Sequence, residues 1–242
     1  MTLENKRLAL CAELVGTDGF ADGAGKKRAA DVGTDHGYLA AYLAAEGICE
    51  RVTACDINEK PLALAERTVR ENGLSDRVRT VLSDGLDSVE NDRFTHIICA
   101  GMGGELIADI IGRCEWARDV HLVLQPMTKA DYLRGFLYRN GFRIERELAV
   151  RDGDFVYSVI LAAHTDAPLD YPCDKRYLAA GRLIAGERGA DDYLRMRAAR
   201  LRKSGEGMLS SNDPATQNAG RLSLELAEAL EAETAHNTDT RR

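Results

Sequence analysis

The 242-residue sequence lacks several features that would place it quickly in a class of proteins. It contains no run of about 18 apolar residues, so no segment is expected to span a membrane. The first 15 residues hold no long apolar stretch before a cleavage site, and we therefore expect a cytoplasmic rather than a secreted protein. The six cysteines are scattered and none belongs to a Cys-x-x-Cys pair. Buried, reduced thiols are the expected state, and no metal site is predicted.

The sequence also lacks a dinucleotide fingerprint and a uniformly basic composition. The stretch AADVGTDHGYLA, residues 29–40, contains the glycines of a nucleotide-binding turn but not the Gly-x-Gly-x-x-Gly pattern. The formal net charge of −7 argues against a uniformly basic nucleic-acid binder. The charge is uneven, however, because nine basic and only three acidic residues lie between Lys175 and Lys203. This segment is expected to have a different partner from the rest of the chain.

A regular alternation of short apolar strands and amphipathic helices begins at residue 28 and continues to about residue 141. Such an alternation predicts an α/β fold with a parallel sheet covered on both faces. The next two extended runs, within residues 142–164, are separated by Asp152-Gly153, a strong hairpin signal. Five parallel strands closed by a hairpin are typical of the class I methyltransferase fold. This Rossmann-like fold has a mainly parallel seven-stranded sheet and an antiparallel C-terminal hairpin.

The composition changes again after Pro168 and Pro172, where the sequence becomes helical and basic. We therefore predict a cofactor-binding methyltransferase domain over residues 1–166 and a small helical hairpin, coiled-coil-like, over residues 167–242. An apolar stripe of the first long helix is expected to pack on a second helix over residues 219–233. The stripe consists of Leu194, Ala198 and Leu201, and its expected partners are Leu222, Leu226 and Leu230.

The charge of the glycine turn favours a cationic ligand. Carboxylates at Asp31 and Asp35 would repel a pyrophosphate but attract the sulfonium and ammonium groups of S-adenosylmethionine (SAM). Asp56 ends the second strand, where an acid accepts ribose hydroxyls, although a helix N-cap is the alternative interpretation. Asp84 ends the third strand, at the position that faces the adenine amino group in class I methyltransferases; an ordinary Asp-Gly turn is the alternative. Three acids at three consecutive strand ends are more specific than any one of them.

Two further strand ends complete the expected cleft. The fourth strand ends in CAGMGGE, residues 99–105, whose three glycines favour close approach of a ligand over a simple turn. The fifth ends in LQPM, where the amide of Gln125 could hold a base edge or cap the strand. His36 is either a base or a packed or ligand-contacting side chain, whereas His96 and His121 are interpreted as structural.

Five of these strings together resemble the bacterial tRNA (adenine-22-N1)-methyltransferase family, TrmK. The strings are ADVGTDHGYLA, CDINEKPLALA, SDGL, ICAGMGGELI and LVLQPM, and the resemblance runs in register from about residue 5 to 162. It implies a SAM-binding sheet domain, a C-terminal coiled-coil-like domain, and methylation of N1 of an adenine in the D-loop of tRNA. The family often has Gln-Pro-Asn where this chain has Met127 after Gln-Pro, which leaves no expected role for that side chain.

The predicted function is SAM-dependent methylation of N1 of a tRNA adenine, by a chain for which a monomer is favoured. A methyltransferase acting on a small molecule or protein, and a non-catalytic SAM- or RNA-binding protein, remain the alternatives. The candidate catalytic residues are Asp35, His36 and Gln125. The candidate cofactor-binding residues are Asp31, Gly33, Thr34, Asp35, His36, Gly37, Asp56, Ile57, Asp84, Gly85, Leu86, Ala100, Gly101, Met102 and Gly103. The candidate RNA-binding residues are Lys26, Lys27, Arg195, Arg197, Arg200, Arg202 and Lys203.

Overall fold

The structure is a computed structural model that describes residues 1–18, 26–90 and 92–239. It divides into two compact units. The first consists of residues 1–146 and 159–170, and the second of residues 147–158 together with residues from 171 onward. The outer part of the strand pair, residues 147–158, therefore groups with the C-terminal helices. A single boundary in the sequence, such as the one predicted between residues 166 and 167, does not describe this division.

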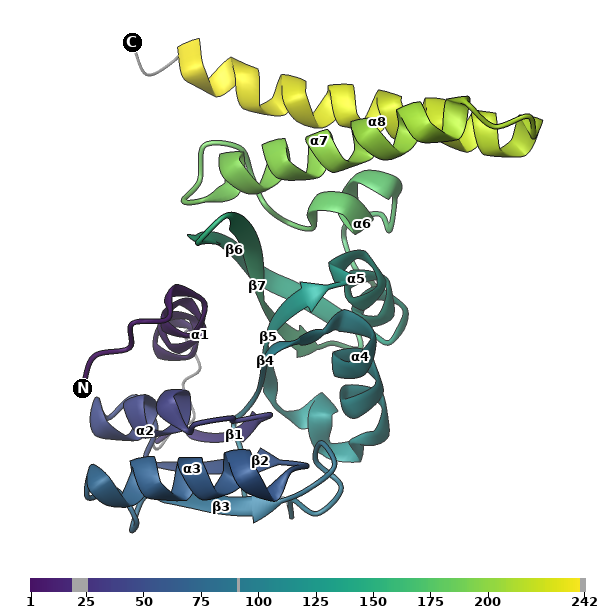
Figure 1. Cartoon of the computed structure of the whole chain (residues 1–242). Helices are drawn as coiled ribbons and strands as arrows, with labels where there is room; N and C mark the ends of the chain where they lie inside the picture. Colours follow the sequence, from purple (N-terminus) through teal and green to yellow (C-terminus); the bar gives the residue numbers. More distant parts are fainter. Residues whose placement is uncertain (19–25, 91, 240–242) are drawn as a thin grey trace. The chain divides into compact units, whose positions relative to one another are not determined.

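The seven strands form one sheet, in the strand order β3-β2-β1-β4-β5-β7-β6 (Figure 1). The first five strands pair in parallel and β7 pairs antiparallel with β5, which confirms the predicted class I methyltransferase topology. The bounds are β1 Arg28–Val32, β2 Arg51–Asp56, β3 Val78–Leu82, β4 His96–Gly103, β5 His121–Thr128, β6 Phe142–Asp152 and β7 Phe155–His164.

Helices cover both faces of the parallel part of the sheet (Figure 1). Helices α1, α2 and α3 lie on one face, and α4 and α5 lie on the other. Their bounds are α1 Lys6–Thr17, α2 Tyr38–Ala45, α3 Glu59–Glu71, α4 Gly104–Arg113 and α5 Ala130–Arg139, and a short 3-10 helix, η1, spans Glu115–Asp119. None of the helices in the described part of the chain has the length and apolar character that a membrane crossing requires.

Local sequence explains where these helices begin and which side they bury. The Asn5 side chain accepts hydrogen bonds from the Arg7 and Leu8 backbone N–H groups, so α1 begins at Lys6. In α3 the buried residues Leu62, Ala65 and Val69 recur at helical spacing and face the sheet. The strands of a parallel sheet are buried on both faces, as β4 is over its first four residues.

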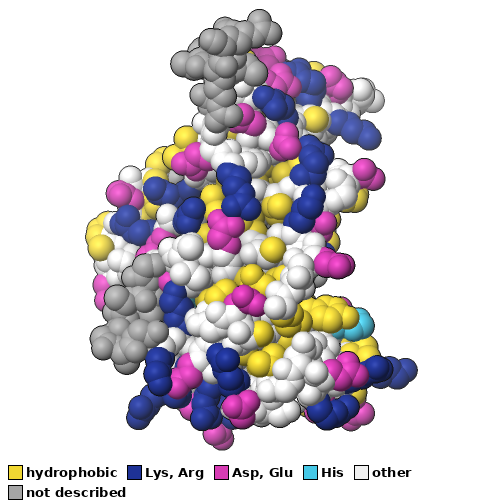
Figure 2. Space-filling model, turned by 90° about the vertical axis from the view of Figure 1, so that its left-hand side faces the viewer, with side chains coloured by type: hydrophobic (Ala, Val, Ile, Leu, Met, Phe, Trp, Pro, Cys, Tyr) yellow, Lys and Arg dark blue, Asp and Glu magenta, His cyan; other side chains and the backbone are white. Residues whose placement is uncertain are grey.

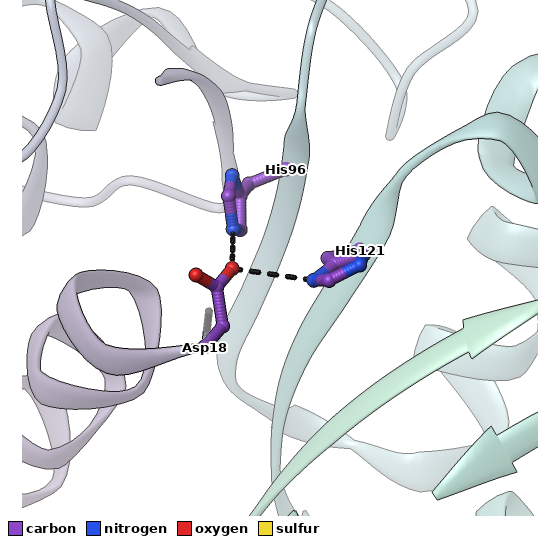
Figure 3. Close-up of side chains that lie close together, drawn as sticks. All are labelled: Asp18, His96 and His121. Carbon is purple, nitrogen blue, oxygen red and sulfur yellow. Dashed lines mark hydrogen bonds and ion pairs between the residues drawn. The ribbon is translucent and has the colours of Figure 1, made fainter. Parts of the chain in front are cut away.

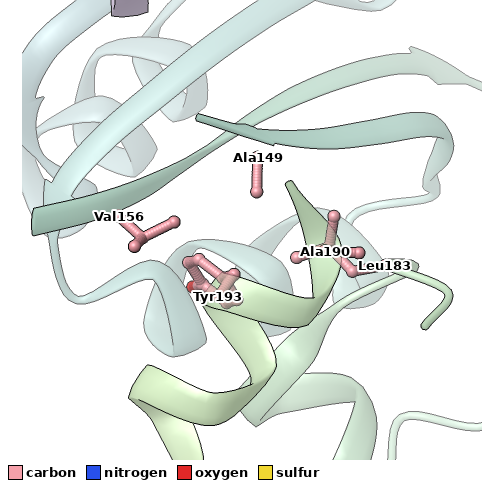
Figure 4. Close-up of a cluster of buried hydrophobic side chains, with 5 residues drawn as sticks. All are labelled: Ala149, Val156, Leu183, Ala190 and Tyr193. Atoms are coloured by element: carbon pink, nitrogen blue, oxygen red, sulfur yellow. The ribbon is translucent and has the colours of Figure 1, made fainter. Parts of the chain in front are cut away.

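The second unit contains helices α6 Lys175–Ala180, α7 Ala190–Leu209 and α8 Pro214–Asp239. The start of α7 packs on the outer part of the strand pair through a cluster of buried apolar side chains (Figure 4). The cluster consists of Ala149, Val156, Leu183, Ala190 and Tyr193.

Helices α7 and α8 form the expected hairpin, with two corrections. Helix α8 begins at Pro214 instead of residue 219, because Asp213 accepts a hydrogen bond from the Thr216 N–H and proline suits the first turn. Leu194 and Ala198 do pack with Leu230, with Leu201 and Leu226 half-buried beside them. The prediction for Leu222 is wrong, since its side chain is exposed.

Glycines allow the two long helices to approach closely. A Cβ atom on Gly205 would lie 2.8 Å from the Gly220 carbonyl oxygen, and one on Gly220 would lie 2.9 Å from the Gly205 carbonyl oxygen. Side chains at these positions would force the helices apart, so this pair of glycines fixes where α7 and α8 cross.

Candidate active site

The glycine turn after β1 is held against the carboxyl ends of the neighbouring strands. The N–H groups of Gly33 and Thr34 both donate to the Cys55 carbonyl oxygen, at 2.8 and 3.0 Å. Gly37 has φ +71°, and a Cβ atom there would lie 2.9 Å from Ala65. These contacts place the turn at the edge of the sheet where parallel folds bind ligands.

Asp31 is buried at the base of this turn. Its carboxylate accepts a 2.6 Å hydrogen bond from the Thr34 hydroxyl. Burial nevertheless raises the pKa of Asp31 from 3.8 to about 6, and the nearby charge of Asp56 acts in the same direction. Burial disfavours the charged form of the Asp31 carboxyl. A cation bound in the turn would favour that charged form and offset the effect of burial.

Asp35 and His36 project from the rim of the turn. Asp35 adopts φ +50°, an unusual conformation for a residue other than glycine, and its side chain is 72% exposed. The His36 Nε2 atom lies 3.7 Å from the Asp35 carboxylate, and the imidazole stacks on the Tyr38 ring. His36 and Tyr38 also line a pocket of about 280 Å³. Two of the three candidate catalytic side chains, Asp35 and His36, are therefore accessible at the surface.

The end of β2 offers a carboxylate and an apolar side chain. Asn58 is the N-cap residue of α3, so Asp56 is not the helix cap. One Asp56 carboxylate oxygen accepts hydrogen bonds from the Asn58 backbone and side chain, at 2.8 and 3.3 Å. Ile57 is 60% exposed at the same strand end. A carboxylate beside an exposed apolar side chain suits a ribose followed by a planar base.

The end of β3 carries an ion-pair network that the sequence did not reveal. Arg113, from the last turn of α4, contacts three carboxylates. Its Nη2 atom lies 3.2 Å from Asp84, its Nη1 atom pairs with Asp87, and its Nε atom lies 3.1 Å from Asp109. Asp84 thus stays at the strand end but is held by Arg113. Gly85 follows with φ +56°, where a Cβ atom would lie 2.9 Å from Ile110, and Leu86 is buried.

The glycines at the end of β4 differ in their surroundings. Pairing with β5 is irregular at Ala100, Met102 and Gly103, and Gly101 has φ +84°. A Cβ atom on Gly104, by contrast, would lie 2.3 Å from the Lys129 carbonyl oxygen. Packing against backbone therefore explains Gly104, and the expectation that all three glycines serve a ligand is corrected for this one.

The side-chain amide of Gln125 is buried and hydrogen-bonded within the protein, so it is not exposed for binding a base. It is fully buried, and its Oε1 atom accepts hydrogen bonds from the Gly101 N–H at 3.1 Å and from the Arg7 guanidinium at 3.2 Å. Its Nε2 atom donates to the Pro126 carbonyl oxygen at 3.1 Å. Gln125 therefore fixes the ends of β4 and β5, and Arg7, which was not among the predicted site residues, reaches the same strand ends from α1. Arg7 also contacts the Met127 sulfur at 2.9 Å.

The candidate RNA-binding residues of the first unit differ from expectation. Lys27 is largely buried, and its ammonium donates to the Asp18 carboxylate at 2.6 Å. The prediction for Lys27 is therefore corrected to a structural ion pair. Lys26 remains 65% exposed, although it pairs with Glu50 at 3.0 Å. On the face drawn in Figure 2, basic and acidic side chains are interspersed, and hydrophobic side chains gather beside a histidine in the lower half.

In the second unit, the cations of α7 are not equivalent. Arg195, Arg200 and Lys203 are exposed. Arg202 instead makes a two-point contact with the Glu231 carboxylate of α8, at 2.7 and 3.3 Å, so its charge is already paired. Arg197 is half-buried, and its Nε atom is buried without a hydrogen-bond partner among the described residues.

Comparisons with known proteins agree with this geometry. A family model described as "Methyltransferase domain" matches residues 5–160. A Bacillus subtilis protein named "tRNA (adenine(22)-N(1))-methyltransferase" is 31% identical over 157 residues, which cover 64% of this chain and 65% of that protein. The sequence match thus spans slightly less than two thirds of that relative.

Two solved structures share the fold over almost the whole chain. The B. subtilis M1A22 tRNA methyltransferase TrmK has a TM-score of 0.78 and 22% identity, and the match covers 95% of this chain and 99% of that one. M. capricolum TrmK, solved in complex with S-adenosyl-homocysteine, has a TM-score of 0.76 and 22% identity, with 94% and 97% covered. At this level of identity the likeness establishes the fold, including the C-terminal helices.

Proposed function

The chain belongs to the methyltransferase-domain family, and we propose that within it the protein is a SAM-dependent tRNA (adenine-22-N1)-methyltransferase. The observation that carries the proposal is the row of carboxylates Asp31, Asp56 and Asp84 at the ends of β1, β2 and β3. The B. subtilis relative, whose name states this activity, supports the choice of substrate.

The residues at these strand ends fit SAM. Asp31 is a buried carboxyl whose raised pKa leaves it poised for a cation, and Gly33 adopts φ +71° in the turn above it. Asp56 would accept the ribose hydroxyls beside Ile57, and Asp84 would face the adenine amino group. Thr34, Gly37, Gly85, Leu86 and residues 100–103 would form the remaining walls. When bound, SAM supplies a methyl group on a positively charged sulfur.

The protein's contribution to the chemistry is orientation and electrostatics. Adenine N1 has an in-plane lone pair and needs no base before it attacks. The ring gains positive charge as the bond forms, so a carboxylate nearby is favourable. Asp35 on the exposed rim is the candidate for this role and His36 the second, whereas the buried Gln125 holds the strand ends in position.

Replacing Asp35 with Asn should lower turnover more than it weakens SAM binding. The substitution keeps the shape and removes the charge that stabilises the developing cation. Because Asp35 is well exposed, we expect a loss in kcat of at least about tenfold, below the factor of about 10²–10³ for a preorganised buried donor. Single-turnover rates and calorimetric Kd values would be compared. Equal losses in both would mean that Asp35 only holds the cofactor.

The affinity for SAM is expected to rise as the pH is raised through about 6. Asp31 has a pKa of about 6 without ligand, and a bound cation favours its ionised form. Binding below that pH therefore releases one proton from Asp31, and Kd should fall by about tenfold for each pH unit that the pH is raised toward 6. The same shift makes the unliganded protein lose stability as the pH rises through about 6, because the folded state favours the protonated carboxyl. Calorimetry on wild type and Asp31→Asn would test this. A flat wild-type profile would contradict it.

We propose that residues 167–242 form the tRNA-contacting region, with the exposed cations of α7 binding phosphates. Replacing Arg195, Arg200 and Lys203 with Gln should weaken tRNA binding and flatten its salt dependence, by about 0.9 in the logarithmic slope for each lost contact. SAM affinity should be unchanged. Arg202→Gln is the matched control, because its charge is already paired with Glu231. Wild-type affinity and slope in the triple variant would locate docking elsewhere.

The function itself is tested by methylating tRNA with labelled SAM, digesting the product, and identifying the modified nucleoside and its position. The expected result is 1-methyladenosine at position 22. Label transferred only to a protein or small molecule would favour the first alternative, and SAM binding without transfer would favour the second. We further propose that the protein acts as a monomer in the cytoplasm, where its tRNA substrate is found.

A further inference from the structure

Three side chains of the first unit converge at the amino ends of the parallel strands, whereas the candidate active site lies at their carboxyl ends (Figure 3). Asp18 is the C-cap residue of α1, His96 is the first residue of β4, and His121 is the first residue of β5. His96 and His121 are register partners in the parallel pair, so the sheet itself holds the two imidazoles side by side. We call these three residues the amino-edge cluster.

The donor atoms of the amino-edge cluster are close enough to share one ion. The Asp18 Oδ2 atom contacts His96 Nε2 and lies 3.2 Å from His121 Nδ1, and the three donor atoms all lie within 4.8 Å of one another. Bonds of about 2.0–2.2 Å from nitrogen and oxygen to a zinc ion need ligand atoms a little over 3 Å apart. A small outward movement of the side chains would meet this requirement.

Neighbouring residues orient the donor atoms of His96 and Asp18 toward one another. The Thr95 hydroxyl lies 2.7 Å from His96 Nδ1, which directs Nε2 toward Asp18. Such a second hydrogen bond orients most metal-binding histidines. Lys27 occupies the other carboxylate oxygen of Asp18, Oδ1, and leaves Oδ2 facing the histidines.

We propose that Asp18, His96 and His121 bind a divalent transition-metal ion, with zinc as the test ion. Two imidazoles and one carboxylate are a donor set that zinc commonly takes. The ion would join the end of α1 to β4 and β5 at the edge away from the cofactor turn. Its role is therefore structural and independent of the proposed methyl transfer. The nearby Lys27 ammonium opposes a cation and limits the affinity.

The test is calorimetry of the chelator-treated full chain with zinc, together with absorption spectra of the cobalt-loaded protein. We expect one ion per chain and a cobalt spectrum of nitrogen and oxygen ligands without thiolate bands. His121→Gln should weaken binding by more than the 10- to 100-fold typical of an outer-shell change, which Thr95→Val should produce. Lys27→Met should strengthen binding, because it removes a competing charge.

His164→Gln is the matched control, since it removes a histidine of the same unit that lies outside the cluster. Circular dichroism would confirm that each variant is folded. The proposal is overturned if wild type binds no zinc, if His121→Gln and His164→Gln bind it equally, or if thiolate bands identify cysteine ligands. In the first case the cluster is a closed hydrogen-bond network, in which His96 and His121 donate to Asp18.

Discussion

Replacing Asp18 with Ala is expected to lower the free energy of unfolding by about 3–5 kcal/mol. The Asp18 side chain is fully buried and receives the Lys27 ammonium and two imidazoles. Its removal takes the ion-pair partner from Lys27, which is only 15% exposed, and takes the Asp18 carboxylate from His96 Nε2. A broken buried pair costs far more than an exposed one, because the remaining charge has no access to water.

The measurement is urea unfolding followed by circular dichroism, with a chelator present so that no metal contributes. Glu71→Ala is the matched control, because it removes an acid from an exposed helical pair with Arg67. The control should leave the unfolding midpoint almost unchanged. A loss below about 1 kcal/mol in Asp18→Ala would mean that the network adds no more than a surface pair.

Replacing Asp56 with Ala should weaken SAM binding by about 1.5–3 kcal/mol, or about 10- to 150-fold. The substitution removes a charge-assisted hydrogen bond to the ribose hydroxyls, at a strand end where Asp56 as a whole is only 9% exposed. It also removes the acceptor for the Asn58 N–H, so part of the loss could be local rearrangement.

Asp56→Asn separates these two effects. The amide oxygen can still accept from the Asn58 N–H, but it carries no charge for the ribose. We therefore expect an intermediate loss of affinity in Asp56→Asn, measured by calorimetry at a pH well above 6 so that Asp31 is ionised. Unchanged affinity in Asp56→Ala would reject the assignment of this carboxylate to the cofactor.

Features carried by short sequence patterns were predictable. The alternation of strands and helices gave the parallel sheet, and Asp152-Gly153 gave the strand pair, whose turn has φ +60° at Gly153. The resemblance to the TrmK family rests on such local strings and is confirmed by the relatives found. These patterns succeed because turn and strand preferences act between near neighbours in the chain.

Features that depend on distant pairs were not predictable. Asp18 is separated by 78 residues from His96 and by 103 from His121, so no pattern of spacing in the sequence predicts their contact. The sequence gives no sign that Lys27 and Arg202 are paired. In the fold, Lys27 forms an ion pair with Asp18, and Arg202 forms one with Glu231. Likewise, only the folded chain places Arg113 between three acids or Arg7 against Gln125.

Helix α1 is attached at both edges of the same two strands. Arg7 in its first turn holds Gln125 at one edge, and Asp18 at its end holds His96 at the other, about 18 Å away for 12 helical residues. The two contacts hold α1 along β4 and β5, so a substitution that breaks either one is expected to loosen the same helix.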